Sequence, residues 1–256
     1  MRTLPLFLIV LLLISALTNQ LFSVDFFRYF FLIQKTIPNF LENDYYPVIW
    51  HLSIEEFFYL LFPLIVICFN PNNFISKIIF IFILITVLKF FLSDSFDANF
   101  YRTGTFLRFD AILLGFILAH YKNQILQNKK TIISLFLLFS VIYLFNSDYF
   151  ISSKEITYTK FFFILLMQIA SGLMMLSFIL LEPLIENDYL KRFSLLISQQ
   201  AYSIYLFHMI FIYLLKETNL SIFVGTSLYL ISLFFISTLV YKYFEEPIMK
   251  LRPNIL

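Results

Sequence analysis

The stretch Trp50–Leu60, WHLSIEEFFYL, carries a histidine and two adjacent glutamates at the entrance of an apolar run that continues to Phe69. Apolar runs of roughly 17–25 residues are long enough to cross a bilayer as helices. We therefore predict a membrane-spanning helix over 54–69, with ends that extend into the flanking residues. Charged side chains at such a boundary are unfavourable, so the two glutamates need a partner, a ligand or water.

The composition extends this interpretation to the whole chain. Its 256 residues are 61% hydrophobic and 21% aromatic, and only 13% are charged, which is more apolar than a soluble domain of this length. The net charge of +2 gives no reason to expect a nucleic-acid partner, so membrane lipids are the expected surroundings. The single cysteine, Cys68, cannot form an intrachain disulfide and is expected to pack rather than react.

Eight apolar runs follow one another along the sequence, and they are hydrophobic on all sides, as expected for helices surrounded by lipid and by each other. They cover residues 4–23, 54–69, 75–92, 106–120, 132–146, 160–181, 201–215 and 221–241. No polar break between them is long enough for a second domain. The predicted fold is therefore all-α: a polytopic helical membrane protein with about eight transmembrane helices, in a single membrane-embedded domain over residues 1–256.

Two features bear on the topology. The apolar core at 4–17 has the length of a signal peptide, but Ser15-Ala16-Leu17-Thr18 lacks small residues at both key positions of a cleavage site. A retained helix is favoured, and a signal peptide remains the alternative. Placing the N-terminus in the cytoplasm puts the excess of lysine and arginine on that side, mainly through the cluster at 122–130. We therefore predict a multi-pass protein of the inner (cytoplasmic) membrane with both termini in the cytoplasm.

Four stretches, in this order, form a pattern that extends over nearly the whole chain. Residues 50–60 match W-S-L-S-x-E-E-x-F-Y-L except for His51, and residues 108–115, RFDAILLG, are close to R-x-D-A-L-L-L-G. Residues 201–208, AYSIYLFH, are close to S-Y-S-I-Y-L-x-H, and residues 244–247, FEEP, fit an E-P ending after an aromatic residue. Together they resemble the integral-membrane acyltransferases of bacterial surface polysaccharides, often called acyltransferase family three.

The resemblance also shows what has no counterpart here. Members of this family usually have two further helices at the N-terminal end, and the first carries a histidine thought to be the catalytic base. Neither helix is found in the sequence. We therefore expect the chain to be N-terminally truncated relative to the family, and a chain that is complete as given would lack that base.

The resemblance implies transfer of an acyl group, commonly acetyl, from cytoplasmic acyl-CoA to a hydroxyl of a cell-envelope glycan or a lipid-linked sugar. This reaction needs a base for the hydroxyl proton, stabilisation of the oxyanion, and both substrates held in line. The catalytic candidates are Glu55, Glu56 and His208, and the substrate-binding candidates are Trp50, Tyr59, Arg102, Arg108 and Asp110. Acyl-CoA is expected as co-substrate, with no bound cofactor and, given the lack of any metal-binding motif, no metal.

Several of these candidates also have plainer interpretations. Glu55 and Glu56 could be favoured by a helix N-terminus, although they point about 100° apart on a helix, so one explanation does not suit both. A bidentate pair between Arg108 and one of the glutamates would lower the cost of both charges. Arg102 could snorkel to the lipid headgroups, and His208 could be a neutral histidine bonded to a neighbouring helix.

Two other functions stay open. One is a non-catalytic or degenerate membrane paralogue, and the other is a glycan or lipid translocase. A transporter should show pseudo-symmetric halves with interrupted helices, and we find no matching halves in the sequence. The enzyme is therefore the favoured interpretation.

Overall fold

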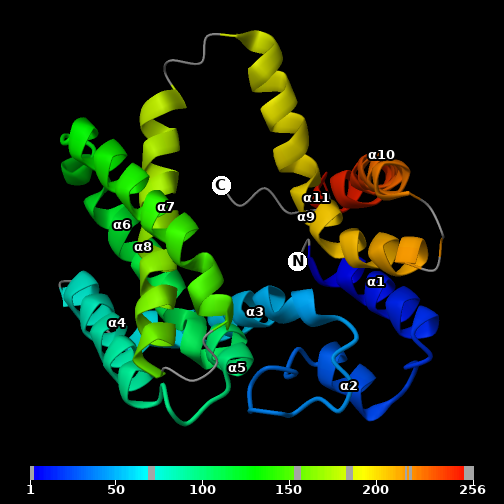
Figure 1. Cartoon of the computed structure of the whole chain (residues 1–256), viewed down its shortest axis with the longest axis horizontal. Coiled ribbons are helices and arrows are strands. Elements are labelled where there is room, and N and C mark those ends of the chain that lie inside the picture. Colours follow the sequence, from blue (N-terminus) through cyan, green and yellow to red (C-terminus); the bar gives the residue numbers. More distant parts are fainter. Residues whose placement is uncertain are drawn as a thin grey trace. The chain divides into compact units, whose positions relative to one another are not determined.

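The computed structural model describes residues 3–68, 73–152, 157–182, 187–216, 218 and 221–250. Within these ranges every regular element is a helix, which confirms the all-α class (Figure 1). Short elements join the long helices. They are α2 (Val24–Phe30), α5 (Ala98–Thr103), α11 (Glu246–Lys250), the 3-10 turns Pro47–Ile49 and Phe106–Arg108, and a π-helical turn at Tyr241–Glu245.

Each of the apolar runs lies largely on one long helix. These helices are α1 (Thr3–Leu17), α3 (Trp50–Cys68), α4 (Phe74–Phe91), α6 (Phe109–Ile125), α7 (Lys129–Ser152), α8 (Thr157–Leu181), α9 (Asp188–Lys216) and α10 (Ile222–Val240). In the described ranges, 5 stretches are long and apolar enough to cross a membrane: Pro47–Ile67, Phe74–Phe91, Lys160–Leu181, Asp188–Lys216 and Ile222–Lys250. The protein is therefore multi-pass, and the larger count of about eight crossings stays a prediction.

α9 begins well before the run predicted at 201–215. Its first turns are exposed and mix charged with apolar residues, and the Asn187 side chain accepts a hydrogen bond from Tyr189 N at 2.9 Å at the start of the helix. A search for segments that are apolar on all sides finds only the later part of such a helix.

The chain divides into two compact units. Unit 1 comprises Met1–Ile33, Leu41–Ile49 and Asn187–Leu256, and unit 2 comprises Gln34–Phe40 and Trp50–Glu186. Unit 1 therefore contains α1, α2 and α9 to α11, whereas unit 2 contains α3 to α8. The single domain over residues 1–256 stays a prediction.

In unit 1, Asp25 anchors the segment 41–46 to α2. Its buried carboxylate accepts hydrogen bonds from Asn43 N at 2.6 Å and from Arg28 Nη1 at 2.6 Å. Charge-assisted hydrogen bonds of this kind are stronger than neutral ones. The carboxylate is therefore satisfied inside the unit, and the irregular segment is held in place.

Two tyrosines attach the same segment to α9. Tyr46 Oη donates to Leu206 O at 2.8 Å, and Tyr213 Oη of α9 donates to Tyr45 O at 2.9 Å. Burial raises the pKa of Tyr46, so its hydroxyl stays protonated and remains a donor at neutral pH.

A π-helical turn ends α10. Glu245, the last residue of this turn, is 1% exposed and accepts a hydrogen bond from Ser203 of α9. The next residue, Glu246, forms an ion pair with Lys250 at 2.8 Å on the surface. A π turn inserts an extra residue into the helix, which places Glu245 on the buried side and Glu246 outside.

In unit 2, aromatic packing joins α3 to α6. Phe58 of α3 is buried, and its ring centroid lies 6.0 Å from that of Phe109 in α6. Ile78 of α4 and Leu113 of α6 complete this core. α7 and α8 pack side by side, as Figure 1 shows.

We expect Asp25→Ala to lower the free energy of unfolding by about 1–3 kcal/mol, because the donors on Asn43 and Arg28 lose their acceptor. Amide hydrogen exchange at residues 41–46 of the purified protein should become faster. Unchanged exchange there would contradict the anchoring role.

The matched control is Asp97→Ala. Asp97 caps α5 by accepting hydrogen bonds from Asn99 N and Phe100 N, each at 3.1 Å. Its loss should speed exchange at the start of α5 and leave residues 41–46 protected.

Candidate functional site

A buried ion pair fixes the start of α6. Lys89 lies in the last turn of α4, and Asp110 lies in the first turn of α6. Lys89 Nζ donates to Asp110 Oδ2 at 2.6 Å, and both side chains are 2% exposed. Asp110 Oδ1 also accepts from Ala111 N at 2.7 Å. Since removal of one partner from a buried pair costs about 3–5 kcal/mol, this contact holds α4 and α6 in one register.

Tyr101 of α5 supports the same pair. Its hydroxyl donates to Lys89 O at 2.9 Å, and the Lys89 ammonium lies 5.7 Å from its ring centroid. Burial, with the negative charge of Asp110, raises the pKa of Tyr101, so the hydroxyl remains a donor. Asp110 was predicted to bind substrate. The structure places it against Lys89, and a role toward substrate stays a prediction.

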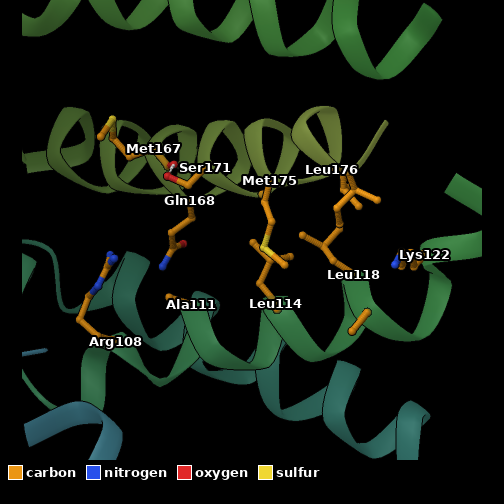
Figure 2. Close-up of a pocket in the computed structure, with 14 residues that line it drawn as sticks. Arg108, Ala111, Leu114, Leu118, Lys122, Met167, Gln168, Ser171, Met175 and Leu176 are labelled. Carbon is orange, nitrogen blue, oxygen red and sulfur yellow. Dashed lines mark hydrogen bonds between the residues drawn. The ribbon is translucent and has the colours of Figure 1, made fainter. Parts of the chain in front are cut away.

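A cavity of about 520 Å³ lies between α6 and α8 (Figure 2). Small residues line it, namely Ala111, Gly115 and Ala119 on α6 and Gly172 on α8. A Cβ at Gly172 would lie 2.7 Å from Leu118 Cδ1, whereas a Cβ at Gly115 would meet nothing within 4 Å. The volume falls within the roughly 300–1,000 Å³ of small-molecule sites.

Arg108 and Gln168 point toward each other at one end of this cavity, and Lys122 lies at the other (Figure 2). Gln168 is 6% exposed, and among the described residues neither its Oε1 nor its Nε2 has a hydrogen-bond partner. A buried amide left without partners is unfavourable by about 1–3 kcal/mol. A ligand or water that supplies an acceptor and a donor would therefore bind favourably at this end.

The predicted pairing of Arg108 with Glu55 or Glu56 is wrong. In the part of the chain that the structure describes, the Arg108 guanidinium forms no ion pair with either carboxylate. The reason is the orientation of α3, which turns Phe58 toward α6. Glu55 is left exposed and Glu56 half-buried.

The other candidates of α3 are Trp50, its first residue, and Tyr59, in its middle. The rings of Trp50 and His51 lie close together and tilted by 33°, with centroids 3.5 Å apart. Tyr59 is 64% exposed, one turn after Glu55 and on the same face of the helix. These residues do not line the α6–α8 cavity, and their roles in catalysis and binding stay predictions.

Arg102 occupies the last turn of α5 and is exposed. Arg102 and Arg108 precede α6 within unit 2, and Asp94 and Asp97 of the same segment balance their charge. The substrate-binding role of Arg102 stays a prediction.

His208 belongs to unit 1, on α9. Its Nδ1 lies 2.6 Å from Tyr205 O, and the ring is half-buried. Because a carbonyl oxygen only accepts, Nδ1 carries the hydrogen and Nε2 keeps its lone pair. Nε2 has no hydrogen-bond partner among the described residues. The contact expected with a neighbouring helix is therefore made within α9 itself.

Two residues that sequence reasoning missed, Lys89 and Gln168, are prominent in unit 2. Each is a long polar side chain with apolar neighbours inside an apolar run, at 75–92 and 160–181 respectively. Isolated polar residues at such depth signal a partner or a site. The same criterion that selected Arg108 and His208 would have found both.

The described helices are those of a multi-pass membrane protein, and a cation and an unpartnered amide lie at one end of an apolar cavity. Residues 1–242 match the acyltransferase domain family. The chain belongs to this family, acyltransferase family three, as the four sequence stretches indicated.

Two known proteins are similar in sequence to this chain. An uncharacterized protein of Haemophilus influenzae is 32% identical over 186 residues, which cover 57% of this chain and 74% of that protein. The O-acetyltransferase OatA of Staphylococcus aureus is 26% identical over 235 residues, which cover 79% of this chain and 36% of OatA. The match thus spans about a third of the length of OatA. No solved structure matches the chain.

We expect Lys89→Met alone to destabilise the protein by about 3–5 kcal/mol, because Asp110 is left as an uncompensated buried charge. The double variant Lys89→Met/Asp110→Leu should recover most of this loss. Thermal unfolding of the purified variants in detergent measures both effects.

The rate of acyl transfer by the double variant then shows whether Asp110 also binds substrate or only pairs with Lys89 in the fold. A stable double variant that still transfers at the wild-type rate would show that Asp110 serves the fold alone. A double variant as unstable as Lys89→Met would contradict the pairing.

Proposed function

We propose that this protein transfers an acyl group from acyl-CoA to a hydroxyl of a cell-envelope glycan. Membership of the acyltransferase family supports a transferase. Similarity to a protein named O-acetyltransferase supports a hydroxyl acceptor and makes acetyl the first donor to test. The observation that carries the proposal is the placement of Arg108 beside the unpartnered amide of Gln168 at one end of an apolar cavity.

The reaction requires specific groups. The acceptor hydroxyl oxygen attacks the thioester carbonyl carbon, so that a C–O bond forms and the C–S bond breaks. The hydroxyl proton passes through a base to the CoA thiolate, which leaves as a thiol. Guanidinium and amide N–H groups such as those of Arg108 and Gln168 are suited to stabilising the oxyanion of the tetrahedral intermediate.

The candidates for the base are Glu55, Glu56 and His208. The tautomer of His208 leaves a lone pair on Nε2, which suits proton abstraction from a hydroxyl. His208 is therefore chemically suited to this step, and Glu55 and Glu56 stay candidates beside it.

The remaining predicted residues have other roles in this proposal. Arg102 offers positive charge to the phosphates of the donor. Trp50 and Tyr59 offer ring faces to an acceptor sugar, and Asp110 acts by holding Lys89 and the start of α6. A cytoplasmic donor and an envelope acceptor agree with a location in the inner membrane with both termini in the cytoplasm.

Replacing Arg108 with alanine should lower acyl transfer by about 10²–10³-fold, because one donor to the oxyanion is lost. Membranes supplied with radiolabelled acetyl-CoA and a panel of envelope glycan fragments provide the assay. Arg192→Ala, which removes an exposed arginine of α9, is the control and should transfer at the wild-type rate.

A wild-type rate in Arg108→Ala membranes would exclude the oxyanion role. Failure of the wild type to label any acceptor, together with the absence of CoA release, would favour a non-catalytic paralogue or a translocase instead.

For His208, alanine should lower kcat by about 10²–10⁴-fold with little change in KM, since general-base catalysis is lost while binding remains. Added imidazole should restore part of the rate, which a purely structural role would not allow. A variant whose loss lies in KM, with no rescue by imidazole, would remove His208 from the proposed chemistry.

A further inference from the structure

We infer that the cavity between α6 and α8 holds the hydrocarbon chain of the donor's acyl group, so that this protein transfers acyl groups longer than acetyl. The inference rests on the proposed acyl transfer and names the donor class for the same cavity. Arg108 and Gln168 mark its polar end, where the reacting carbonyl would lie (Figure 2).

The cavity is far larger than an acetyl group requires. Its volume is about 520 Å³, whereas the space taken by a water molecule, which is close in size to a methyl group, is about 30 Å³. Glycine and alanine on α6 keep this space open, and no side chain occupies the position that a Cβ of Gly115 would take. An acetyl donor would leave most of the cavity without a ligand.

Between Gln168 at one end and Lys122 at the other, the walls are those of a hydrocarbon site. Leu114 faces Met175, and Leu118 faces Leu176, across the gap between α6 and α8 (Figure 2). The Ser171 hydroxyl already donates to Met167 O at 2.8 Å within α8. The two amides of a pantetheine arm would lose their hydrogen bonds to water along these walls, whereas a methylene chain has none to lose. The walls therefore favour the acyl chain over the pantetheine arm.

The polar end suits the carbonyl from which such a chain extends. A thioester oxygen accepts a hydrogen bond from Gln168 Nε2, which has no other partner among the described residues. Arg108 offers a compensating charge as that oxygen becomes negative in the transition state. A hydrocarbon without a carbonyl, such as the middle of a lipid tail, would leave Gln168 unsatisfied.

Substitution at Gly115 tests this placement with a matched control. Gly115→Leu directs a side chain into the cavity from a position where a Cβ is unobstructed. Gly225 of α10 is equally unobstructed and does not line the cavity, so Gly225→Leu controls for the loss of a helical glycine.

The donors are acetyl-, octanoyl- and palmitoyl-CoA, offered to the full chain in membranes with the same glycan panel. We expect the wild type to transfer the octanoyl or palmitoyl group with a kcat/KM at least equal to that for acetyl. Gly115→Leu should lower the ratio of kcat/KM for the long chains to kcat/KM for acetyl by about tenfold or more, whereas Gly225→Leu should leave this ratio at the wild-type value. Gln168→Leu should lower transfer of all three groups alike, because it removes the carbonyl donor and not the chain site.

Photolabelling locates the chain independently of turnover. Palmitoyl-CoA with a diazirine near the end of its chain should label peptides of α6 and α8 in the wild type and in Gly225→Leu, but not in Gly115→Leu. Unlabelled palmitoyl-CoA should compete more strongly than CoA at the same concentration, because the chain adds to the affinity. Competition by CoA as strong as that by palmitoyl-CoA would show that the chain has no site of its own, and equal competition by phosphatidylglycerol would assign the cavity to a membrane lipid; either result overturns the inference.

The two proposals fail in different ways. Transfer of acetyl alone, with no labelling of α6 or α8, overturns the inference while acyl transfer stands. Labelling of α6 and α8 without transfer of any group leaves a site for an acyl chain and overturns the enzymatic proposal on which the donor assignment rests.

Discussion

Lys89 and Asp110 carry opposite charges, and they meet at 2.6 Å where almost no water reaches them. Neither charge tolerates that position alone, since a buried ion without a partner is strongly unfavourable. The pair therefore holds the end of α4 to the beginning of α6. Arg108 is two residues before Asp110, so its side chain leaves the backbone at a place that this contact determines. The polar end of the α6–α8 cavity thus depends on an ion pair that does not line it.

Elsewhere in the described ranges, buried polar groups largely satisfy one another. Asp25 accepts from Asn43 and Arg28, and Glu245 accepts from Ser203. Gln168 differs, because both ends of its amide lie buried without a partner beside a cation and a cavity. If Gln168 served packing alone, leucine would be the more stable residue at this position between two helices, because leucine has no hydrogen bonds to lose. Its presence therefore agrees with a ligand that brings a carbonyl to this point.

The sequence marked charged residues in apolar surroundings but did not show how they pair. Arg108 and the two glutamates were singled out as unusual, and the pairing expected between them was wrong. An arginine and a glutamate on different helices meet only if both helices turn the right faces toward each other, and Phe58 occupies that face of α3. The sequence likewise does not show that Lys89 faces its partner, which lies twenty-one residues later on another helix. Gln168 was overlooked because a single uncharged polar residue changes the hydropathy of an apolar run only slightly.

Composition and the length of the apolar runs by themselves determined that this protein is helical and multi-pass, because the backbone of a segment surrounded by lipid must satisfy its hydrogen bonds internally. Four short stretches determined the family. Only the tertiary structure decided which face of each helix is buried, that Asp110 binds Lys89, and that α6 and α8 leave a cavity between them. Those outcomes follow from side-chain volumes on neighbouring helices, where one glycine opens space and another permits close approach. No single segment of the sequence contains that information, since each helix supplies only half of every contact.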